Sequence, residues 1–355
     1  MRRWKKCIAA LMAAALVFGV SPTARAGSET VRAEVVCVGD LLCLGGQLSA
    51  AKTRSGYDFD YVFSGVRKLI SGADLAMGNL ETPAAGPKGG YTRTGQTGFP
   101  ILNAPYSYLK AVKSAGFDLV TTANNHAADK GERGIRTTLK NIRRAGMTAT
   151  GTFASKRAKR YAVKNVNGIR VGVLAYNEGG YNRKQYSLSA EKRSYMLNTY
   201  SYARAKADIR RLRREGRADV VIVAVHWGEE NTHSVTSGQK RIARQLAAAG
   251  ADVVVGSHPH VLQKFQYLKG KSGKKTLVAY SLGNFVSSMP RPENRDAVIL
   301  RLRLTKRDGE TGVKAEYLPV RTGSRWKIRA PKSLSAKEKA GIRKVTGKAV
   351  KMILQ

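Results

Sequence analysis

Residues 218–228 read Ala-Asp-Val-Val-Ile-Val-Ala-Val-His-Trp-Gly, and residues 249–260 read Ala-Gly-Ala-Asp-Val-Val-Val-Gly-Ser-His-Pro-His. Each stretch is a run of β-branched apolar residues that ends in histidine. Such runs are typical of buried parallel strands, which carry polar groups at the carboxyl edge of a sheet. Three of the five histidines stand at these two strand ends. Because neutral imidazole is a common transition-metal ligand, the two stretches predict a metal site.

The rest of the chain alternates predicted strands and helices. In its first part this order is β-α-β-α-β-α, which favours a parallel sheet with helices on both faces. The Asn167-Gly168 pair predicts a hairpin, so antiparallel strands are expected as well. Strands are expected at 31–38, 74–81, 117–123, 161–166, 169–176, 262–268, 275–281, 297–304 and 314–320, and helices at 59–70, 105–115, 132–145, 202–215 and 239–249. The fold class predicted from this pattern is α/β with mixed sheets.

Polar residues that follow the predicted strands form the candidate site. In open α/β sheets, ligands bind at the carboxyl ends of the strands. Carboxylates, amide oxygens and imidazoles together suit Mn, Fe or Zn, and a bridging carboxylate would hold two ions. A histidine that is not a ligand could protonate a leaving group. The candidates are Asp40, Asn79, Glu81, Asn124, Asn125, His126, His226, His258 and His260.

Six short motifs extend this set between about residues 31 and 320. They are Gly39-Asp40, Asn79-Leu80-Glu81, Asn124-Asn125-His126-x-x-Asp129-x-Gly131, His226-Trp227-Gly228-x-Glu230, Gly256-x-His258-Pro259-His260 and Ser281-Leu282-Gly283-Asn284-Phe285. In order and spacing they resemble the CapA-type capsule-synthesis family, whose members are linked to poly-γ-glutamate. The resemblance implies a fold similar to the calcineurin-like metallophosphoesterases, a four-layer αββα sandwich with mixed sheets.

The resemblance also implies a role for each residue of the site. Asp40 and His260 would bind a first metal ion, Glu81 would bridge, and Asn125, His226 and His258 would bind a second ion. His126 would be the proton donor with Asp129, supported by Asn79, Asn124, Glu230 and Asn284. Three positions depart from the pattern. Leu42 stands where the superfamily has a metal-binding histidine, Glu81 replaces its usual bridging aspartate, and Asn231 replaces a tyrosine.

The first 26 residues combine a basic start, an apolar run and Ala24-Arg25-Ala26, which is typical of a secretory signal cleaved after Ala26. An uncleaved N-terminal membrane anchor is the alternative. Residues 27–325 are then expected to form the CapA-like domain, and residues 326–355 a basic helical tail that packs on the domain or lies on an anionic membrane. Cys37 and Cys43 remain after processing, and their redox state is left open.

The charge of the chain points to anionic partners. The whole chain carries +39, and residues 1–26 hold five Lys or Arg and no acidic residue, which leaves +34. Such a field attracts polyanions. Because export is expected, poly-γ-glutamate or another anionic envelope polymer is favoured over nucleic acid, and capsule-synthetase membrane proteins are candidate partners.

These observations favour an exported protein of poly-γ-glutamate capsule biosynthesis or export with a metal-dependent phosphoesterase-like site. Two alternatives remain open. One is a non-catalytic polyanion-binding or assembly factor that uses the same residues for a structural ion. The other is an exported phosphodiesterase unrelated to capsule.

Overall fold

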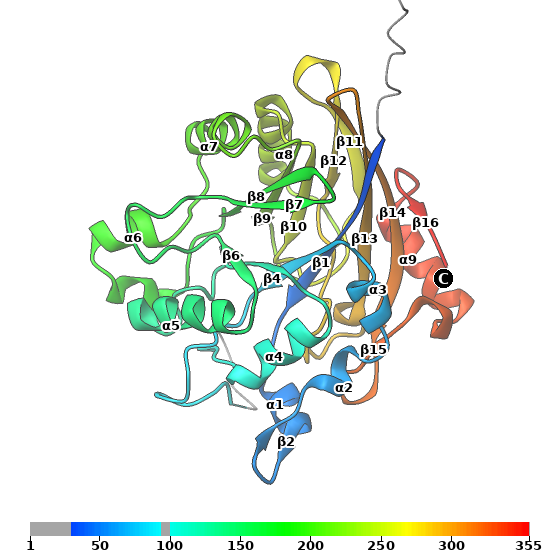
Figure 1. Ribbon diagram of the computed structural model, residues 1–355. Coiled ribbons are helices and arrows are strands. Elements are labelled where there is room, and N and C mark those ends of the chain that lie inside the picture. The colour runs from blue at the N-terminus through cyan, green and yellow to red at the C-terminus, as the bar shows by residue number, and fades with distance from the viewer. Residues whose placement is uncertain (1–29, 94–99, 355) are drawn as a thin grey trace, which may run out of the picture.

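The computed structural model describes residues 30–93 and 100–354, and shows two packed β-sheets between layers of helices (Figure 1). The expected signal peptide, residues 1–26, lies outside the described residues. Within the described part of the chain, no helix combines the length and apolar character that a membrane span requires.

One sheet has eight strands and is mixed. Its order is β15-β14-β13-β1-β4-β5-β6, with β16 paired to β14. Strands β1, β4, β5 and β6 are parallel neighbours, whereas β13 pairs antiparallel with both β1 and β14. The strands are β1 (Val31–Leu41), β4 (Leu75–Leu80), β5 (Leu119–Thr121), β6 (Thr148–Thr150), β13 (Asp296–Arg307), β14 (Glu310–Thr322), β15 (Ile328–Arg329) and β16 (Lys351–Met352).

The other large sheet has six strands in the order β11-β12-β10-β9-β8-β7. Strands β8, β9, β10 and β12 are parallel, and the antiparallel hairpins β7-β8 and β11-β12 close its two edges. The strands are β7 (Ala162–Val166), β8 (Ile169–Asn177), β9 (Val220–His226), β10 (Val253–Ser257), β11 (Phe265–Lys269) and β12 (Lys275–Ala279). A separate small hairpin joins β2 (Lys52–Thr53) to β3 (Gly56–Tyr57).

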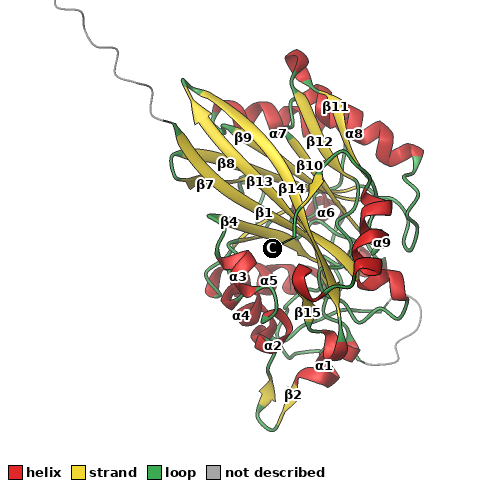
Figure 2. Ribbon diagram, turned by 90° about the vertical axis from the view of Figure 1, so that its right-hand side faces the viewer, coloured by secondary structure: helices red, strands yellow, loops and turns green. Residues whose placement is uncertain are grey.

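Helices cover the outer faces of both sheets (Figure 2). They are α1 (Gly45–Ala51), α2 (Asp60–Phe63), α3 (Arg67–Ser71), α4 (Tyr106–Ser114), α5 (Gly131–Arg144), α6 (Ala190–Met196), α7 (Tyr202–Arg214), α8 (Ser237–Ala249) and α9 (Ala336–Thr346). Short 3-10 helices are η1 (Arg183–Ser187), η2 (Lys271–Gly273), η3 (Pro292–Arg295), η4 (Ser324–Trp326) and η5 (Pro331–Ser333).

Strand β9 shows how the apolar runs build these layers. Val220 and Ile222 pack in the core between the two sheets, whereas Val221 and Val223 pack against α7 and α8 on the outer face. Because successive side chains of a strand point to opposite faces, a strand covered on both faces needs a continuous apolar run. A third core lies between the eight-stranded sheet and α2 to α5. The structure therefore confirms the predicted four-layer αββα sandwich.

Two segments differ from the expected elements. The helix expected at 59–70 is divided into α2 and α3 around Gly65, a poor helix former. The only α-helix in the described part of the C-terminal segment is α9, which ends because Gly347 adopts a φ of 79°. Strand β16 then joins β14, and Ile342 and Val350 are buried in the core that the sheets share. The tail thus packs on the sandwich.

Both cysteines in the described part of the chain are buried and free. Cys37 and Cys43 form no disulfide. Burial raises the pKa of the Cys37 thiol to about 12 and raises that of Cys43 further. Neither thiol is therefore suited to act as a nucleophile or metal ligand near neutral pH.

Candidate metal centre

Both sheets bring polar residues to the same end of the sandwich. From the eight-stranded sheet, Asp40 lies near the end of β1, and Glu81 follows β4. From the six-stranded sheet, His226 ends β9, and His258 follows β10. Because these are parallel strands, their carboxyl ends lie together and their terminal side chains meet.

Glu81 is at the centre of this group and is completely buried. Its Oε1 atom lies 3.7 Å from His226 Nε2 and 3.6 Å from His260 Nε2, yet this oxygen has no hydrogen-bond partner among the described residues. Burial, and secondarily repulsion by Asp40, raises the pKa of this carboxyl well above its ordinary value, although His260 opposes the shift. A buried carboxylate oxygen without a partner is costly unless a cation compensates it, so the residue fits a metal site.

Asp40, Glu81 and His260 form one set of potential ligands, whose donor atoms all lie within 4.8 Å of one another. Asn79 Nδ2 donates to Asp40 Oδ1 at 2.8 Å, and His260 Nδ1 donates to Asn284 Oδ1 at 2.9 Å. Burial alone would lower the pKa of His260, but Glu81 and Asp40 together raise it to about 10. Both ligand side chains are thus oriented by neutral amides, as metal ligands commonly are.

Glu81, His226 and His258 form a second set with the same close spacing. Asn125 Oδ1 lies 2.9 Å from His226 Nε2, which adds an amide oxygen to the set. Burial lowers the pKa of His226 well below its ordinary value, and burial followed by the charge of His260 lowers that of His258 to about 4. Because the buried Nδ1 atom of His258 has no hydrogen-bond partner in the described part of the chain, a neutral nitrogen is available to a cation.

Glu230, His258 and His260 form a third set. Glu230 Oε1 lies 4.0 Å from His260 Nε2, and its side chain is 37% exposed. Leu42, where the resemblance expects a histidine ligand, is buried and offers no donor atom. Glu230 therefore brings a carboxylate to a centre that lacks the histidine.

His126 stands beside these sets in a hydrogen-bonded group of its own. Its Nδ1 atom lies 2.7 Å from Asp129 Oδ2, which also accepts from the backbone N–H of Leu102 at 2.7 Å. Asn182 Nδ2 donates to the other Asp129 oxygen at 3.2 Å and lies 3.0 Å from His126 Nδ1. With Nδ1 directed at Asp129, Nε2 is the atom left for exchange with a substrate.

A cavity of about 870 Å³ opens beside the centre. Its walls include Asn125, Asp129, His226, Glu230 and His258. Pro100 and Ile101 also line it, so the segment that leads into α4 faces the candidate site. Lys184 is the cation among its described lining residues, against three acidic side chains, Asp129, Glu229 and Glu230. Without bound cations this cavity would repel an anionic substrate.

The backbone at the site is held in unusual conformations. His258 and His260 have φ values of 95° and 57°, which non-glycine residues rarely adopt and which are found most often at functional sites. Next to Asp40, a Cβ atom on Gly39 would lie 1.9 Å from the carbonyl oxygen of Gly283. Only glycine fits there, and the contact brings β1 against the Ser281–Phe285 motif.

All the predicted site residues lie in or next to this centre. Asn124 supports it through Asn79, since Asn124 Nδ2 donates to Asn79 Oδ1 at 3.1 Å. Two further residues of the site, Asn182 and Ser257, were not predicted from the sequence. Ser257 Oγ lies 3.1 Å from His226 Nδ1. Ser257 ends β10, directly before the predicted ligand His258, so the strand-end pattern could have identified it. Asn182 lies in the segment 177–198, which has no periodic pattern and no strand-end signal.

The family model described as bacterial capsule synthesis protein PGA_cap matches residues 34–289, which include every residue of this centre. The chain belongs to this family. The predicted CapA-type resemblance is thereby confirmed. The "Capsule biosynthesis protein CapA" of Bacillus anthracis is 32% identical over 293 residues, which are 80% of this chain and 66% of that protein. The "PGA biosynthesis protein CapA" of Bacillus subtilis (strain 168) is 28% identical, over 76% of this chain and 67% of that one.

More distant relatives are also similar. A "Probable polyglutamine synthesis accessory protein" of Mycobacterium tuberculosis is 23% identical over 56% of this chain and 54% of its own length. The chain thus spans about two thirds of the length of the Bacillus relatives and about half of the mycobacterial one. Among solved structures, TT1561 of Thermus thermophilus aligns with a TM-score of 0.40 at 12% identity, over 79% of this chain and 98% of that one.

Proposed function

We propose that this protein is an exported metal-dependent hydrolase or transferase of polyglutamate capsule assembly, acting on a phosphoester or amide bond. One observation carries the metal-dependent part. Glu81 Oε1 lies between His226 and His260, buried and without a hydrogen bond, in two ligand sets at once. A carboxylate shared between two such sets is suited to hold two ions close together.

In this proposal each of the first two sets holds one divalent ion, Mn, Fe or Zn. Asp40 and His260 hold the first, Asn125, His226 and His258 the second, and Glu81 contributes to both. Bound ions would polarise the bond that is broken and activate a water molecule. They would also reverse the acidic character of the cavity, so that it accepts an anionic chain.

His126 has a separate task in the proposed reaction. Asp129 holds the ring through Nδ1, and Asn182 fixes Asp129 in turn. Nε2 is then positioned to give a proton to the leaving group. A histidine held in one tautomer by a carboxylate is suited to this role, because its ring is already oriented before the reaction begins.

The polymer and the location follow from different observations. The names of the Bacillus and Mycobacterium relatives refer to capsule, PGA and polyglutamine synthesis. The net charge of +39 favours an acidic partner of this kind. Export is inferred from the signal-like residues 1–26.

Metal counting tests the centre. The purified protein is loaded with Mn or Zn and compared with Glu81→Gln, which keeps the size of the side chain and removes its charge. We expect two ions per wild-type chain and at least about tenfold weaker binding in the variant. Equal ion content in both proteins would refute the shared carboxylate.

Turnover tests the reaction. A generic phosphodiester and a γ-glutamyl amide are offered to the metal-loaded wild type and to His126→Ala. We expect one of them to be cleaved, with a loss of about 100-fold or more in the variant at unchanged metal content. Cleavage that His126→Ala leaves intact would contradict the assigned proton donor.

A non-catalytic assembly factor is the second candidate, and the first ligand set favours it. Leu42 removes an expected ligand there, and Asp40 and His260 already contact each other at 3.3 Å. If the protein binds ions and polyglutamate but cleaves neither bond with any of the three metals, this second function replaces the first.

A further inference from the structure

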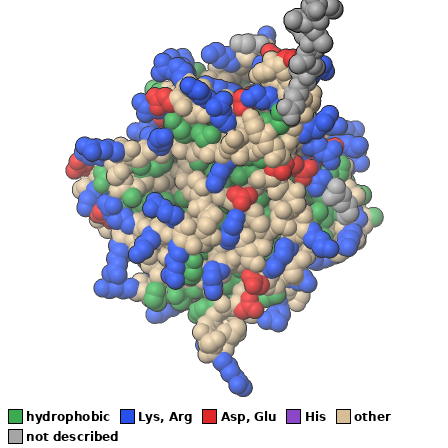
Figure 3. Space-filling model, viewed as in Figure 1, with side chains coloured by type: hydrophobic (Ala, Val, Ile, Leu, Met, Phe, Trp, Pro, Cys, Tyr) green, Lys and Arg blue, Asp and Glu red, His purple; other side chains and the backbone are tan. Residues whose placement is uncertain are grey.

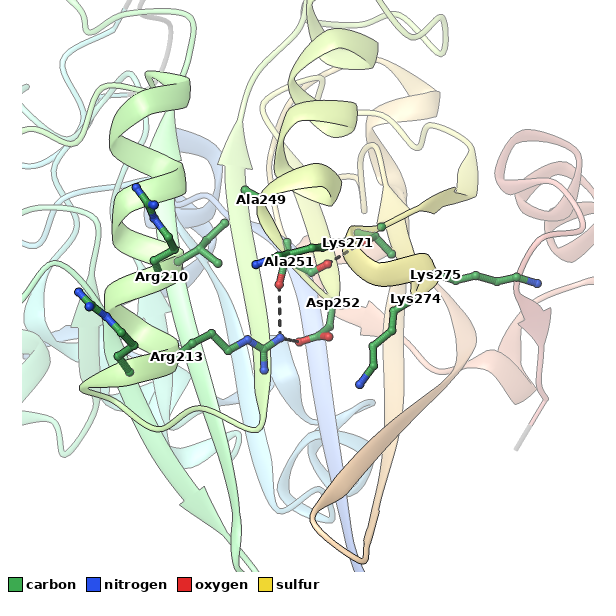
Figure 4. Close-up of a pocket in the computed structure, with 13 residues that line it drawn as sticks. Arg210, Arg213, Ala249, Ala251, Asp252, Lys271, Lys274 and Lys275 are labelled. Atoms are coloured by element: carbon green, nitrogen blue, oxygen red, sulfur yellow. Dashed lines mark hydrogen bonds and ion pairs between the residues drawn. The ribbon is translucent and has the colours of Figure 1, made fainter.

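A second cavity lies on the six-stranded sheet at the end opposite the metal centre. It encloses about 490 Å³ between the last turn of α7, the end of α8 and the turn that joins β11 to β12 (Figure 4). Asp252, which lines it, precedes β10, whereas His258 follows the same strand. Six residues of extended chain separate the two positions by roughly 20 Å.

The cavity is strongly basic. Its lining contains one acidic residue, Asp252, and six cationic ones, Arg210, Arg213, Arg214, Lys271, Lys274 and Lys275. Arg213 neutralises Asp252, to which its Nη2 donates at 2.6 Å, and Nη1 also donates to the carbonyl oxygens of Ala218 and Asp219. Figure 4 shows Arg213 crossing to Asp252 in the middle of the group. This arginine therefore has a structural role.

The other five cations take no part in this structural contact. All are exposed, and within residues 30–93 and 100–354 no ion pair or hydrogen bond of their side chains is found. Lys271 Cδ comes within 3.8 Å of the place where a Cβ would stand on Gly250, so this side chain reaches over the end of α8. Lys275 points away from the cavity in Figure 4, which leaves Lys271 and Lys274 as the central lysines of the turn.

The surrounding elements indicate which anion fits. Helices α7 and α8 both end at this cavity, at Arg214 and Ala249. Helix carboxyl termini present carbonyl oxygens and a partial negative charge, so these two helices contribute no N–H groups to a bound anion, and cationic side chains must hold it. Separate lysines on flexible stems suit anionic charges that are spaced along a chain. The cavity thus fits an anionic chain whose spaced charges are held by side chains.

We propose that this basic cavity is a second binding site, which holds successive carboxylates of polyglutamate away from the metal centre. The identity of the polymer rests on the proposed function, whereas the anionic chemistry rests on the cavity itself. In this proposal the cavity retains the polymer while another part of the same polymer, or another polymer chain, is processed at the metal centre.

Charge reversal with a matched control tests the site. Labelled polyglutamate is titrated at low, constant ionic strength, and binding is followed by fluorescence anisotropy. The test variant is Lys271→Glu/Lys274→Glu. The control is Lys110→Glu/Lys140→Glu, on exposed positions of α4 and α5 in the other helical layer, which changes the net charge equally. We expect Kd to rise about tenfold in the test variant and less than about twofold in the control.

Three results would overturn the proposal. Equal losses in both variants would show that only net charge matters. Unchanged binding in the test variant would exclude the cavity. If inorganic polyphosphate binds the wild type more tightly than polyglutamate and loses its binding in the test variant, the site is a phosphate site.

A metal-site variant separates this proposal from the proposed function. His226→Ala is expected to lose metal and to keep polyglutamate binding, while Lys271→Glu/Lys274→Glu keeps its metal content. If His226→Ala loses the polymer and the cavity variant keeps it, the polymer is held at the metal centre. That result would support the proposed function and refute the second site.

Discussion

Glu230 offers the candidate centre a carboxylate where the expected histidine ligand is absent. Leu42 provides no donor, yet Glu230 reaches His258 and His260 from the loop after β9. Its partial exposure distinguishes it from the buried Glu81. A ligand at the mouth of a centre is suited to exchange, so it can hold an ion and still admit a substrate oxygen.

We therefore predict that Glu230→Gln weakens the binding of one ion. The variant keeps the shape of the side chain and removes the charge, so a loss of about tenfold in affinity is expected for that ion alone. Calorimetric titration with Mn or Zn measures it. Glu229→Gln is the matched control, since Glu229 lines the same cavity but belongs to none of the ligand sets. The same loss in both variants would indicate a general effect of charge.

The Asp129 carboxylate offers a second test at this scale. In Asp129→Asn an amide faces His126 Nδ1 and can donate to it, which favours the tautomer with the proton on Nε2. We expect turnover to fall about 100-fold, with unchanged metal content, and its pH profile to change. Turnover close to that of the wild type would show that Asp129 does not orient the proton donor.

At the scale of elements, β1 is held in place by a contact that only glycine permits. Gly39 packs against the Gly283 carbonyl, and the Asp40 backbone N–H donates to the same oxygen at 3.1 Å. In Gly39→Ala the added methyl group cannot be accommodated without moving β1. We expect loss of stability and metal binding that is weaker by about tenfold or more, measured by thermal melting and metal titration. Gly312→Ala on β14, where the nearest atom would be 3.9 Å away, is the control.

The elements that could be predicted from the sequence are those with a clear pattern of apolar residues. Strands β9 and β10 could be predicted because both faces are buried, and their terminal histidines follow from the ends of the apolar runs. Asn182 could not be predicted, since its position depends on how the irregular segment after β8 folds over Asn125, whose carbonyl oxygen accepts from the Asn182 backbone N–H. The return of β16 to β14 depends on long-range pairing, which local helix propensity does not reveal.

At the scale of the whole molecule, the proposed ions would join two separate sheets. Asp40 and Glu81 come from one sheet, and His226 and His258 from the other. A ligand that binds only the folded state stabilises it, by about 2.7 kcal/mol at a concentration 100 times Kd. We expect Mn or Zn to raise the melting temperature and a chelator to reverse the rise. A melting temperature that does not respond to metal would contradict a centre between the sheets.

The surface charge predicts how the protein responds to salt. Figure 3 shows lysine and arginine side chains over the whole visible face, with few acidic ones among them. Attraction between exposed charges is screened over about 8 Å at physiological ionic strength. We expect polyglutamate affinity to fall steadily as salt rises, measured by the same anisotropy titration. An affinity that is insensitive to salt would mean that the cations do not bind the polymer.

The position of β1 has a consequence for biogenesis. This strand lies between β4 and β13, so it pairs with residues 300–306, although it comes from the beginning of the described chain. Pairing across so large a sequence separation is slow, because a long loop must close first. The pairing of β1 with β13 therefore cannot form until residues 300–306 have been synthesised. If the protein is exported as proposed, the nascent chain would stay sufficiently unfolded until then to pass through a secretion channel. Asp40 would reach its final position only after that passage.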